Sequence, residues 1–507
     1  MIKTSFKNKI FNVSHFDKKI NGIQYKETSD FIEYRVDVFR SVPLFLYKDK
    51  SNNIFLFDDM DYFNKNKTFK KEIDVIGFWE IILFGSSLWS RTLFKNLFQM
   101  PSASSLVVNK KNNTFKISRY WDFNVEIDSK ITSIDIAAKK LNHQLNKIAK
   151  SLDKNIDYTI GLSGGIDSRI TLSYLLKYIK KEKLNLFTYA YSKKSLEYQK
   201  AIKISNILNT KKPIFHQLST NSYKNALSYL PRMSGGQIGI NHCHVIDYLK
   251  NNLLDNQTYI SNYFSDAIFG YATQISNSNE EKLQNPFNEV IENSNFLPIE
   301  IKEKIKLDSE FITKGFKLKS GISSLNEYIY ITERNQKFHN YLFNIQKDFI
   351  GNSLSFFNNY DLLVLSLSIP ANFKYKKRIE YYILEKYFPE ISSKKIGDLS
   401  SIYFKTGNKF SSTIKSAKFK LLNRLNALFR IFFKGNFQLY NKYQTEELER
   451  VLYSSFKQEL QRCCDYLYKK GVFNKNHSQF RRLPIRSNGT SQRYAIISLV
   501  NYIKGLK

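Results

Sequence analysis

Cysteine is scarce in this sequence of 507 residues, which contains Cys243, Cys463 and Cys464 and no other. So few thiols exclude a disulfide framework and favour a reducing compartment. No uninterrupted apolar stretch approaches the ~20 residues that a membrane-spanning helix needs. Charged residues also interrupt every apolar run before residue 30, so the pattern of a secretory signal is missing. We therefore expect a cytoplasmic protein.

Acidic side chains are few relative to basic ones, with 45 Asp and Glu against 78 Lys and Arg and a formal net charge of +33. A polyanionic partner such as nucleic acid, acidic lipid or acidic glycan is one explanation for such an excess. Codon bias is the other, because Lys, Asn, Ile, Phe and Tyr are abundant together and the basic residues are dispersed along the chain. We favour codon bias and do not expect a nucleic-acid partner.

One stretch, from Leu399 to Thr445, has no acidic residue at all, although nine Lys and Arg lie within it. Apolar residues recur there at three- and four-residue steps, at Ile414, Ala417, Leu421, Leu425, Leu428 and Phe432. This pattern predicts a basic amphipathic helix over 411–436, which could lie on an anionic membrane surface. The alternative is a helix that packs on its own domain and leaves a solvated basic face. A peripheral position at the inner membrane surface is therefore a second expectation for location.

The residues at 163–168 read Ser-Gly-Gly-Ile-Asp-Ser and lie between a predicted strand, Tyr158–Leu162, and a predicted helix, Arg169–Ile179. Glycines at such a junction let backbone N–H groups face a phosphate, and the helix N-terminus adds a positive dipole. Ser163 and Ser168 add hydroxyl donors, whereas Asp167 would repel a phosphate by itself and therefore suggests a bridging Mg²⁺. An ordinary turn with a serine cap is the alternative. We predict a nucleotide or pyrophosphate site formed by Ser163, Gly164, Gly165, Ile166, Asp167 and Ser168.

The chain divides into three parts by pattern, with expected bounds of 1–128, 129–400 and 401–507. The first part consists of short strands with Asn- and Lys-rich turns and is expected to be a β-rich domain. Between residues 156 and 271, strands alternate with helices, which predicts an α/β fold with a parallel sheet and crossover helices. The expected strands are Tyr158–Leu162, Leu184–Tyr191, Ile214–Leu218 and Tyr259–Tyr263. A ligand would then bind at the carboxyl ends of the strands. The remainder is mostly helical by period, and we expect 401–507 to be a helical C-terminal extension.

The motif resembles the SGGxDS loop of the ATP-pyrophosphatase superfamily, and its surroundings resemble the asparagine synthetase branch. The segment Thr258–Tyr271 is similar to that branch's second signature, in which Asp266, Phe269, Gly270 and Tyr271 match. Glu197 followed by Ala201, and Phe215-His216, lie where the branch has similar residues. Segments between Val38 and Asp122 resemble the glutaminase domain that precedes these synthetases. The resemblance covers roughly residues 35–410 and implies an adenine nucleotide alpha-hydrolase-like fold, ATP and Mg²⁺ as ligands, and Asp167 and Asp266 as metal ligands.

Two departures from the family pattern change the expected chemistry. Glutaminase domains of this family use an N-terminal cysteine as nucleophile, whereas this chain begins Met1-Ile2-Lys3. We therefore expect no glutaminase nucleophile and interpret residues 1–128 as a degenerate glutamine amidotransferase-like domain. The second signature reads Asn262-Tyr263-Phe264 where the family has Gly-Glu-Gly, so a glutamate near the reacting centre is replaced by Tyr263.

The resemblance implies an amide-forming ligase that adenylates a carboxylate, releases pyrophosphate and transfers an amine to the acyl group. The family places a catalytic lysine after an LPxxI-like segment, and here Phe388–Ile391 is followed by Lys394 and Lys395, one or two positions short of that register. The carboxylate would come from a small molecule or a peptide. The nitrogen would come from free ammonia, a partner glutaminase or an amino group of the substrate.

Three other functions stay open. The first is a pathway-specific ligase: β-lactam synthetases and lasso-peptide macrolactam cyclases keep this architecture with a degenerate first domain, and related proteins amidate acidic sugars of surface glycans. The second is a non-catalytic ATP-binding pseudoenzyme, suggested by Tyr263. The third is a tRNA-modifying relative, which the charge would suit but the Asp266-containing signature does not.

Overall fold

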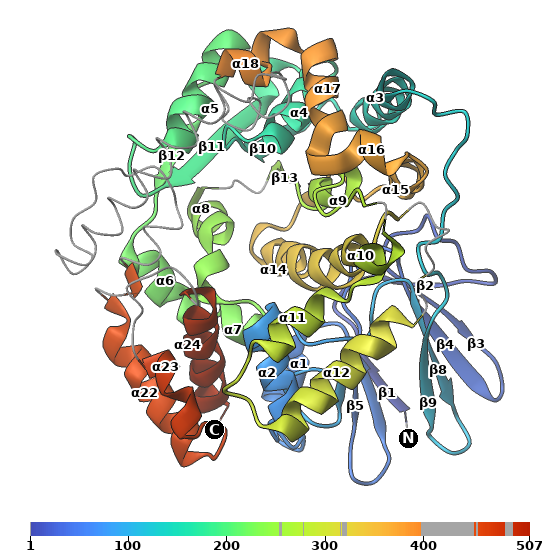
Figure 1. The fold of residues 1–507 in the computed structure, drawn as a ribbon, viewed down its shortest axis with the longest axis vertical. Coiled ribbons are helices and arrows are strands. Elements are labelled where there is room, and N and C mark those ends of the chain that lie inside the picture. The colour runs from blue at the N-terminus through green and yellow to red at the C-terminus, as the bar shows by residue number, and fades with distance from the viewer. Residues whose placement is uncertain are drawn as a thin grey trace.

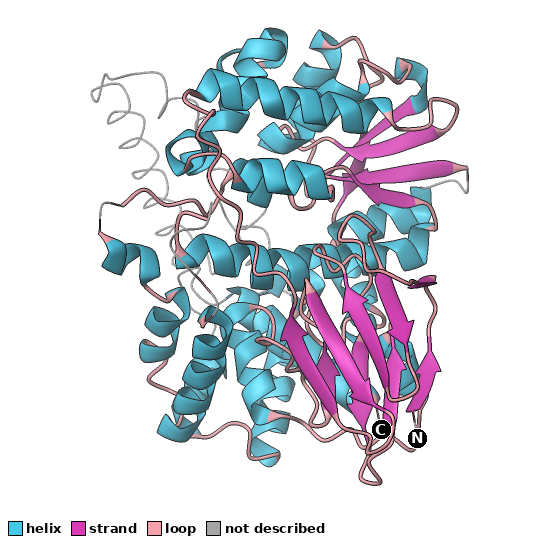
Figure 2. Ribbon diagram, turned by 90° about the vertical axis from the view of Figure 1, so that its right-hand side faces the viewer, coloured by secondary structure: helices cyan, strands magenta, loops and turns pink. Residues whose placement is uncertain are grey.

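The computed structural model describes residues 2–252, 256–276, 278–314, 316, 322–396, 451–452, 455–481 and 490–506. Within these ranges the chain forms three sheets and a large set of helices (Figure 1). The strands lie in two separate groups, an N-terminal sandwich and a parallel sheet, with helices between them (Figure 2). The protein is therefore an α/β molecule with a β-rich N-terminal region and a helical C-terminal part.

The N-terminal region is a sandwich of two sheets that share one apolar core. The first sheet has the order β1-β6-β5-β7 and the second the order β2-β3-β4-β8-β9. Apolar side chains from both sheets, among them Val36, Leu46 and Leu106, are fully buried in one cluster between them, as expected when the inner faces of two sheets interdigitate. The strands are β1 (Ile2–Ser5), β2 (Ile10–Asn12), β3 (Ile23–Glu27), β4 (Phe31–Val36), β5 (Phe45–Lys48), β6 (Ile54–Phe57), β7 (Leu97–Gln99), β8 (Ser104–Asn109) and β9 (Phe115–Arg119).

The second group of strands is a five-stranded sheet in which every pair is parallel. Its order is β12 (Ile214–Gln217), β11 (Leu184–Ala190), β10 (Asp157–Gly161), β13 (Gln257–Ser261) and β14 (Ser353–Ser355). Helix α4 (Ile166–Leu175) follows β10, α5 (Leu196–Ile207) follows β11, and α8 (His244–Asn252) precedes β13. Because all carboxyl ends of a parallel sheet lie at one edge, the loops after β10 and β13 meet there.

Helices account for most of the rest of the described chain. The N-terminal region contributes α1 (Met60–Lys65) and α2 (Val75–Phe84). The central helices are α3 (Ile134–Lys150), α6 (Thr220–Leu227), α7 (Leu230–Met233), α9 (Ser265–Phe269), α10 (Asn279–Leu283), α11 (Pro286–Glu292), α12 (Ile299–Thr313), α13 (Leu325–Ile329), the π-helical segment η3 (Tyr330–His339), α14 (Asn340–Ile350), α15 (Tyr360–Leu367), α16 (Ala371–Lys374), α17 (Arg378–Tyr387) and α18 (Ser393–Ile396). The C-terminal helices are α22 (Lys457–Lys469), α23 (Ser478–Arg481) and α24 (Thr490–Gly505).

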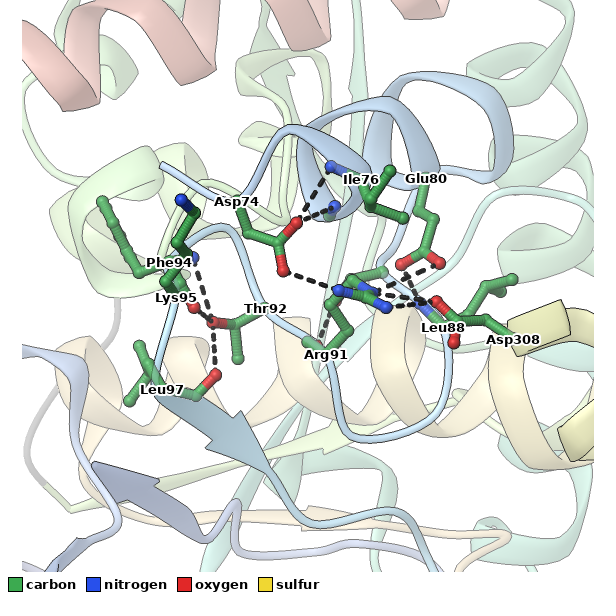
Figure 3. Close-up of polar contacts among 12 residues, drawn as sticks. Asp74, Ile76, Glu80, Leu88, Arg91, Thr92, Phe94, Lys95, Leu97 and Asp308 are labelled. Atoms are coloured by element: carbon green, nitrogen blue, oxygen red, sulfur yellow. Dashed lines mark hydrogen bonds and ion pairs between the residues drawn. The ribbon is translucent and has the colours of Figure 1, made fainter. Parts of the chain in front are cut away.

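A cluster of charged residues joins the N-terminal region to α12 (Figure 3). The Arg91 guanidinium lies 2.7 Å from Asp74 Oδ2 and 2.6 Å from Asp308 Oδ2, and 3.7 Å from Oε1 of the fully buried Glu80. Glu80 also accepts a hydrogen bond from the backbone N–H of Leu88 at 2.9 Å. Burial raises the pKa of the Glu80 carboxyl well above its ordinary value, against the lowering effect of Arg91. One arginine thus connects the start of α2 with a helix more than two hundred residues later.

An aromatic cluster joins the N-terminal region to the C-terminal helices. The indole of Trp79 on α2 is fully buried, and its ring stacks on Phe473 with centroids 5.5 Å apart and on His477 at 4.8 Å. Phe480 on α23 lies 6.2 Å from the same indole. The main apolar core accordingly runs without interruption from α2 to α24.

Most elements predicted from the sequence are present. The strands predicted at Tyr158–Leu162, Leu184–Tyr191, Ile214–Leu218 and Tyr259–Tyr263 correspond to β10, β11, β12 and β13 within two residues at each end. The prediction that the chain after residue 271 is mostly helical is confirmed in the described residues, where the exception is β14, whose three residues carry no apolar pattern and pair with β13. The predicted basic helix at 411–436 lies outside the described residues. None of the described helices is both long and apolar enough to cross a lipid bilayer.

Candidate functional site

The Ser163–Ser168 loop connects the end of β10 to the start of α4. Gly164 has a φ of 75°, and a Cβ built on it would lie 2.5 Å from Cβ of Lys200, so both conformation and space require glycine. Gly165 is the N-cap of α4 and no side chain caps the helix there. Ser163 and Gly165 are exposed, whereas Ser168 is buried and its hydroxyl donates to the Gly165 carbonyl at 3.0 Å. The uncapped helix start is therefore open to an anion.

Two carboxylates from neighbouring strand ends converge on one lysine. Asp167 lies in the first turn of α4, after β10, and Asp266 lies in α9, after β13. The Lys377 ammonium is 2.8 Å from Asp167 Oδ1 and 2.7 Å from Asp266 Oδ1. The Tyr330 hydroxyl donates to the other Asp266 oxygen at 3.1 Å. The structure thus brings together the two aspartates that the sequence placed in one site.

Lys377 is held in place by unusual backbone geometry. Its φ is +60° and that of the preceding Lys376 is +52°, so two consecutive non-glycine residues occupy the left-handed region just before α17. Such conformations cost free energy and persist only when surrounding contacts impose them, which is common at functional sites. The lysine side chain is 12% exposed and also lies 3.3 Å from Glu380, one turn into α17. The left-handed turn at residues 376–377 therefore places the Lys377 ammonium between the two aspartates.

The charges in this cluster shift one another's pKa values. Burial lowers the pKa of Lys377, but the carboxyl groups of Asp167, Glu380 and Asp266 outweigh it and hold that pKa well above its ordinary value. Burial raises the pKa of Asp167, yet Lys377 brings it below its ordinary value. Burial and the charge of Asp167 raise the pKa of Glu380 well above its ordinary value. The cluster is therefore a charged lysine–aspartate pair beside a carboxyl group that ionises less readily than an ordinary glutamate.

A cavity of about 300 Å³ opens beside the cluster at the carboxyl edge of the sheet. One wall carries residues of the 163–168 loop and the two aspartates, and Glu197 of α5 also lines the cavity. The other wall is largely aromatic and apolar. Its side chains belong to Phe187, Tyr189, Val245, Tyr259, Tyr263, Phe264 and His339. The cavity thus joins a polar end, lined by loop residues and carboxylates, to an apolar end lined mainly by aromatic rings.

Tyr263 forms part of the apolar end and is fixed from two sides. Its hydroxyl accepts a hydrogen bond from Gln346 Nε2 at 3.0 Å, and its ring stacks on the His339 imidazole with centroids 5.6 Å apart. Burial raises the pKa of Tyr263 above its ordinary value and lowers the pKa of His339 to about 3. Both rings are therefore neutral at pH 7, and neither supplies a charge to the cavity.

The two lysines predicted from the LPxxI-like segment lie on α18. Lys395 is exposed and does not line the cavity, and the side chain of Lys394 is outside the described part of the chain. Their segment is nevertheless tied to the loop, because the buried Arg169 guanidinium donates to the Ile391 carbonyl at 3.0 Å and lies 3.4 Å from Ser393 Oγ. The catalytic role of Lys394 or Lys395 stays a prediction.

The sequence reasoning missed Lys377 and Glu380. Neither stands in a glycine-rich motif, and nothing in the local pattern distinguishes Lys377 from the neighbouring Lys374 and Lys376. The one available signal was its position in the chain. Lys377 immediately precedes α17, and α17 ends just before Phe388–Ile391, the segment that the resemblance had already connected with the site. His339 and Tyr330 carried no signal, since they reach the site only through the π-helical segment.

The donor set for a metal ion is small. Among the described residues no group of three or more His, Cys, Asp or Glu side chains is arranged to hold a metal. Asp167 and Asp266 nevertheless approach a common point, and Mg²⁺ in nucleotide sites commonly takes only one or two carboxylates, filling its shell with phosphate oxygens and water. A metal that bridged both would have to displace the Lys377 ammonium. Comparison of the sequence with protein-family models and with curated proteins gives no match.

Proposed function

We propose that this chain is an asparagine synthetase-like carbon–nitrogen ligase with an adenine nucleotide alpha-hydrolase-like domain. It would use ATP to activate a carboxylate and transfer the acyl group to an amine. The observation that carries this proposal is the convergence of Asp167, Asp266 and Lys377 beside an uncapped, glycine-containing helix start. A cluster of this kind suits a polyphosphate with its counter-ion better than it suits a neutral ligand.

Each part of the site has a role in this reaction. A carboxylate oxygen of the substrate attacks the α-phosphorus of ATP, the bond to the bridging oxygen of the β-phosphate breaks, and pyrophosphate leaves. Backbone N–H groups at residues 164–168 would hold that pyrophosphate, and Lys377 would offset the negative charge that develops on it. Bound Mg²⁺ would supply further charge neutralisation, held by Asp167 and Asp266. The amine then attacks the acyl carbon, loses a proton and displaces AMP.

The nitrogen would not come from glutamine hydrolysed by this chain. All three cysteines are buried, and burial raises the pKa of the Cys243 and Cys463 thiols above their ordinary values. A nucleophilic cysteine needs the opposite, an accessible thiol with a lowered pKa. Ammonia, a partner glutaminase or an amino group of the substrate would supply the nitrogen, as in macrolactam-forming or glycan-amidating ligases.

A non-catalytic nucleotide-binding protein is the second candidate, and one observation favours it. Tyr263 stands where the resembled family has a glutamate, and its hydroxyl is already committed to Gln346. A site altered in this way could bind ATP without turning it over.

ATP–pyrophosphate exchange with a panel of carboxylates tests the proposal. The wild type should exchange label with at least one carboxylate, and Asp167→Asn should abolish exchange and Mg²⁺-dependent nucleotide binding by calorimetry. Asp157→Asn is the matched control. Asp157 lies at the start of β10, at the end of that strand away from Asp167, and forms an ion pair with Lys183 at 3.5 Å. Unchanged nucleotide affinity in Asp167→Asn would refute the assignment. Binding without exchange would favour the second candidate, and recovery of exchange in Tyr263→Glu would show that this residue is the cause.

A further inference from the structure

Three amide side chains follow one another along the helix that runs from η3 into α14. Gln336, Asn340 and Asn344 are spaced four residues apart, so they lie on one face of the helix. Gln336 and Asn340 are fully buried, and Asn340 Nδ2 also donates to Gln336 Oε1 at 3.2 Å. Burying amide side chains without hydrogen-bond partners costs free energy. The hydrogen-bond partners of this row therefore show which part of the chain it stabilises.

The partners are three successive backbone carbonyls of the N-terminal region. Gln336 Nε2 donates to the Val38 carbonyl at 2.9 Å, Asn340 Nδ2 donates to the Phe39 carbonyl, and Asn344 Nδ2 lies 3.4 Å from the Arg40 carbonyl. The other side of this short loop is held by the buried Asp37 carboxylate, which accepts hydrogen bonds from the backbone N–H of Gly22, Phe39 and Ser41. The loop 37–41 is therefore fixed residue by residue against the helix.

The side chain that this loop presents packs on the candidate site. The Phe39 ring meets the Phe264 ring edge to face, with centroids 5.0 Å apart, and both side chains are buried. Phe264 has a φ of +76°, a left-handed conformation that is unfavourable for a residue with a bulky side chain. It lines the cavity and precedes Asp266 by two residues. Phe39 thus covers a strained residue next to one of the two aspartates.

The same helix also contacts the site directly with other side chains. Tyr330 donates to Asp266, the His339 ring stacks on Tyr263, and Gln346 donates to the Tyr263 hydroxyl. The helix therefore contacts two segments. The amide row binds the loop 37–41, and Tyr330, His339 and Gln346 contact the segment 262–266. Figure 1 shows α14 in the middle of the molecule, between the sandwich and the parallel sheet.

We propose that Phe39 is a positioning residue for the nucleotide site, and that the N-terminal region sets the conformation of the segment 262–266 through the loop 37–41. The inference rests on the proposed function for the meaning of the site, but the contact itself does not depend on a ligand. It also gives the N-terminal region a task that needs no glutaminase nucleophile.

Hydrogen exchange in the protein without nucleotide tests the contact. Phe39→Ala should raise the exchange rate of peptides that cover residues 262–266 by about tenfold, because the strained segment loses its cover. Leu46→Ala is the matched control: Leu46 is equally buried, but it belongs to a separate apolar cluster of the sandwich that includes neither Phe39 nor Phe264. It should lower the unfolding temperature and leave exchange at 262–266 unchanged. Phe39→Leu, which keeps much of the apolar contact, should restore slow exchange.

Calorimetry with Mg²⁺ and α,β-methylene-ATP then links the contact to the site. Phe39→Ala should bind about tenfold more weakly than wild type, a difference that a purely global destabilisation would not produce, while Leu46→Ala should bind as wild type does. If wild type binds no nucleotide, the proposed function fails while the exchange measurement still decides the inference. If Phe39→Ala does not fold, Gln336→Met removes one donor of the row at similar volume and should show the same increase. Equal exchange at 262–266 in wild type, Phe39→Ala and Gln336→Met would overturn the inference.

Discussion

Replacing Lys377 with methionine should make the protein dependent on a divalent cation. The substitution keeps most of the side-chain volume but removes the ammonium that lies 2.8 Å from Asp167 and 2.7 Å from Asp266. Breaking a buried ion pair by removing one partner costs about 3–5 kcal/mol. The two aspartate side chains are 27% and 30% exposed, so water recovers part of this, and we expect the free energy of unfolding to fall by about 2–3 kcal/mol.

Magnesium should return much of that loss. The variant leaves two carboxylates pointing at one place, and a cation that binds only the folded state stabilises it by RT ln(1 + [L]/Kd), about 1.4 kcal/mol at ten times Kd. For a cooperative unit of several hundred residues such a change raises the unfolding temperature by about 1–3 °C. In the wild type the ammonium occupies the place between the carboxylates, so the same Mg²⁺ concentration should have a smaller effect.

Thermal unfolding with and without Mg²⁺, at constant ionic strength, measures both effects. Lys374→Met is the control, because Lys374 is another buried lysine, three residues earlier, whose partner is the single carboxylate of Glu327 at 3.3 Å. It should be destabilised as well, yet gain nothing specific from Mg²⁺. The reasoning is refuted if Mg²⁺ shifts the unfolding temperature of Lys377→Met no more than that of the wild type and of Lys374→Met.

Three further predictions concern stability. Phe264→Gly should be more stable than Phe264→Ala by about 1 kcal/mol in denaturant unfolding, because both lose the ring and only glycine adopts a φ of +76° without strain; equal stability would show that the segment relaxes. Arg91→Met should lower the unfolding free energy by about 2–4 kcal/mol, since it leaves the carboxylates around Glu80 without their cation, and Asp308→Asn in that background should recover part of the loss. Burial lowers the pKa of His244 to about 4, below the ordinary 6.5, so its contribution to stability is complete above pH 6.5 and is lost as the pH falls toward 4. The wild type should therefore lose stability between pH 7 and pH 5, and in His244→Gln this loss should be smaller by about 2 kcal/mol, as measured by denaturant unfolding at each pH.

The parts of this molecule that could be predicted from sequence are those whose cause is local. The segment from β10 to α4 was predicted because a β-branched run, two glycines and a helical period stand next to one another. Asp266 was placed with Asp167 through the resemblance of Thr258–Tyr271 to the second signature of the family, and two ends of adjacent parallel strands, which share an edge, fit that placement.

The parts that escaped depend on contacts between distant residues. Lys377 is delivered by two left-handed residues that carry long side chains rather than glycine, so no composition signal marks the turn. Phe264 hides a left-handed position in the same way, at a place where the resembled family has glycine. β14 is a strand only because β13 offers it an edge, and three residues are too few to show a period.

The cluster around Trp79 has a consequence for how the chain is made. Synthesis proceeds from the N-terminus at about 5–20 residues per second, and domains that are complete usually fold as they emerge. Trp79 is translated some four hundred residues before Phe473, His477 and Phe480, the residues that pack on its ring in the folded protein. The indole therefore waits about 20–80 seconds for its cover. During that interval α2 presents an aromatic surface on the ribosome-bound chain, and we expect the nascent N-terminal region to be a substrate for chaperones that bind exposed apolar segments.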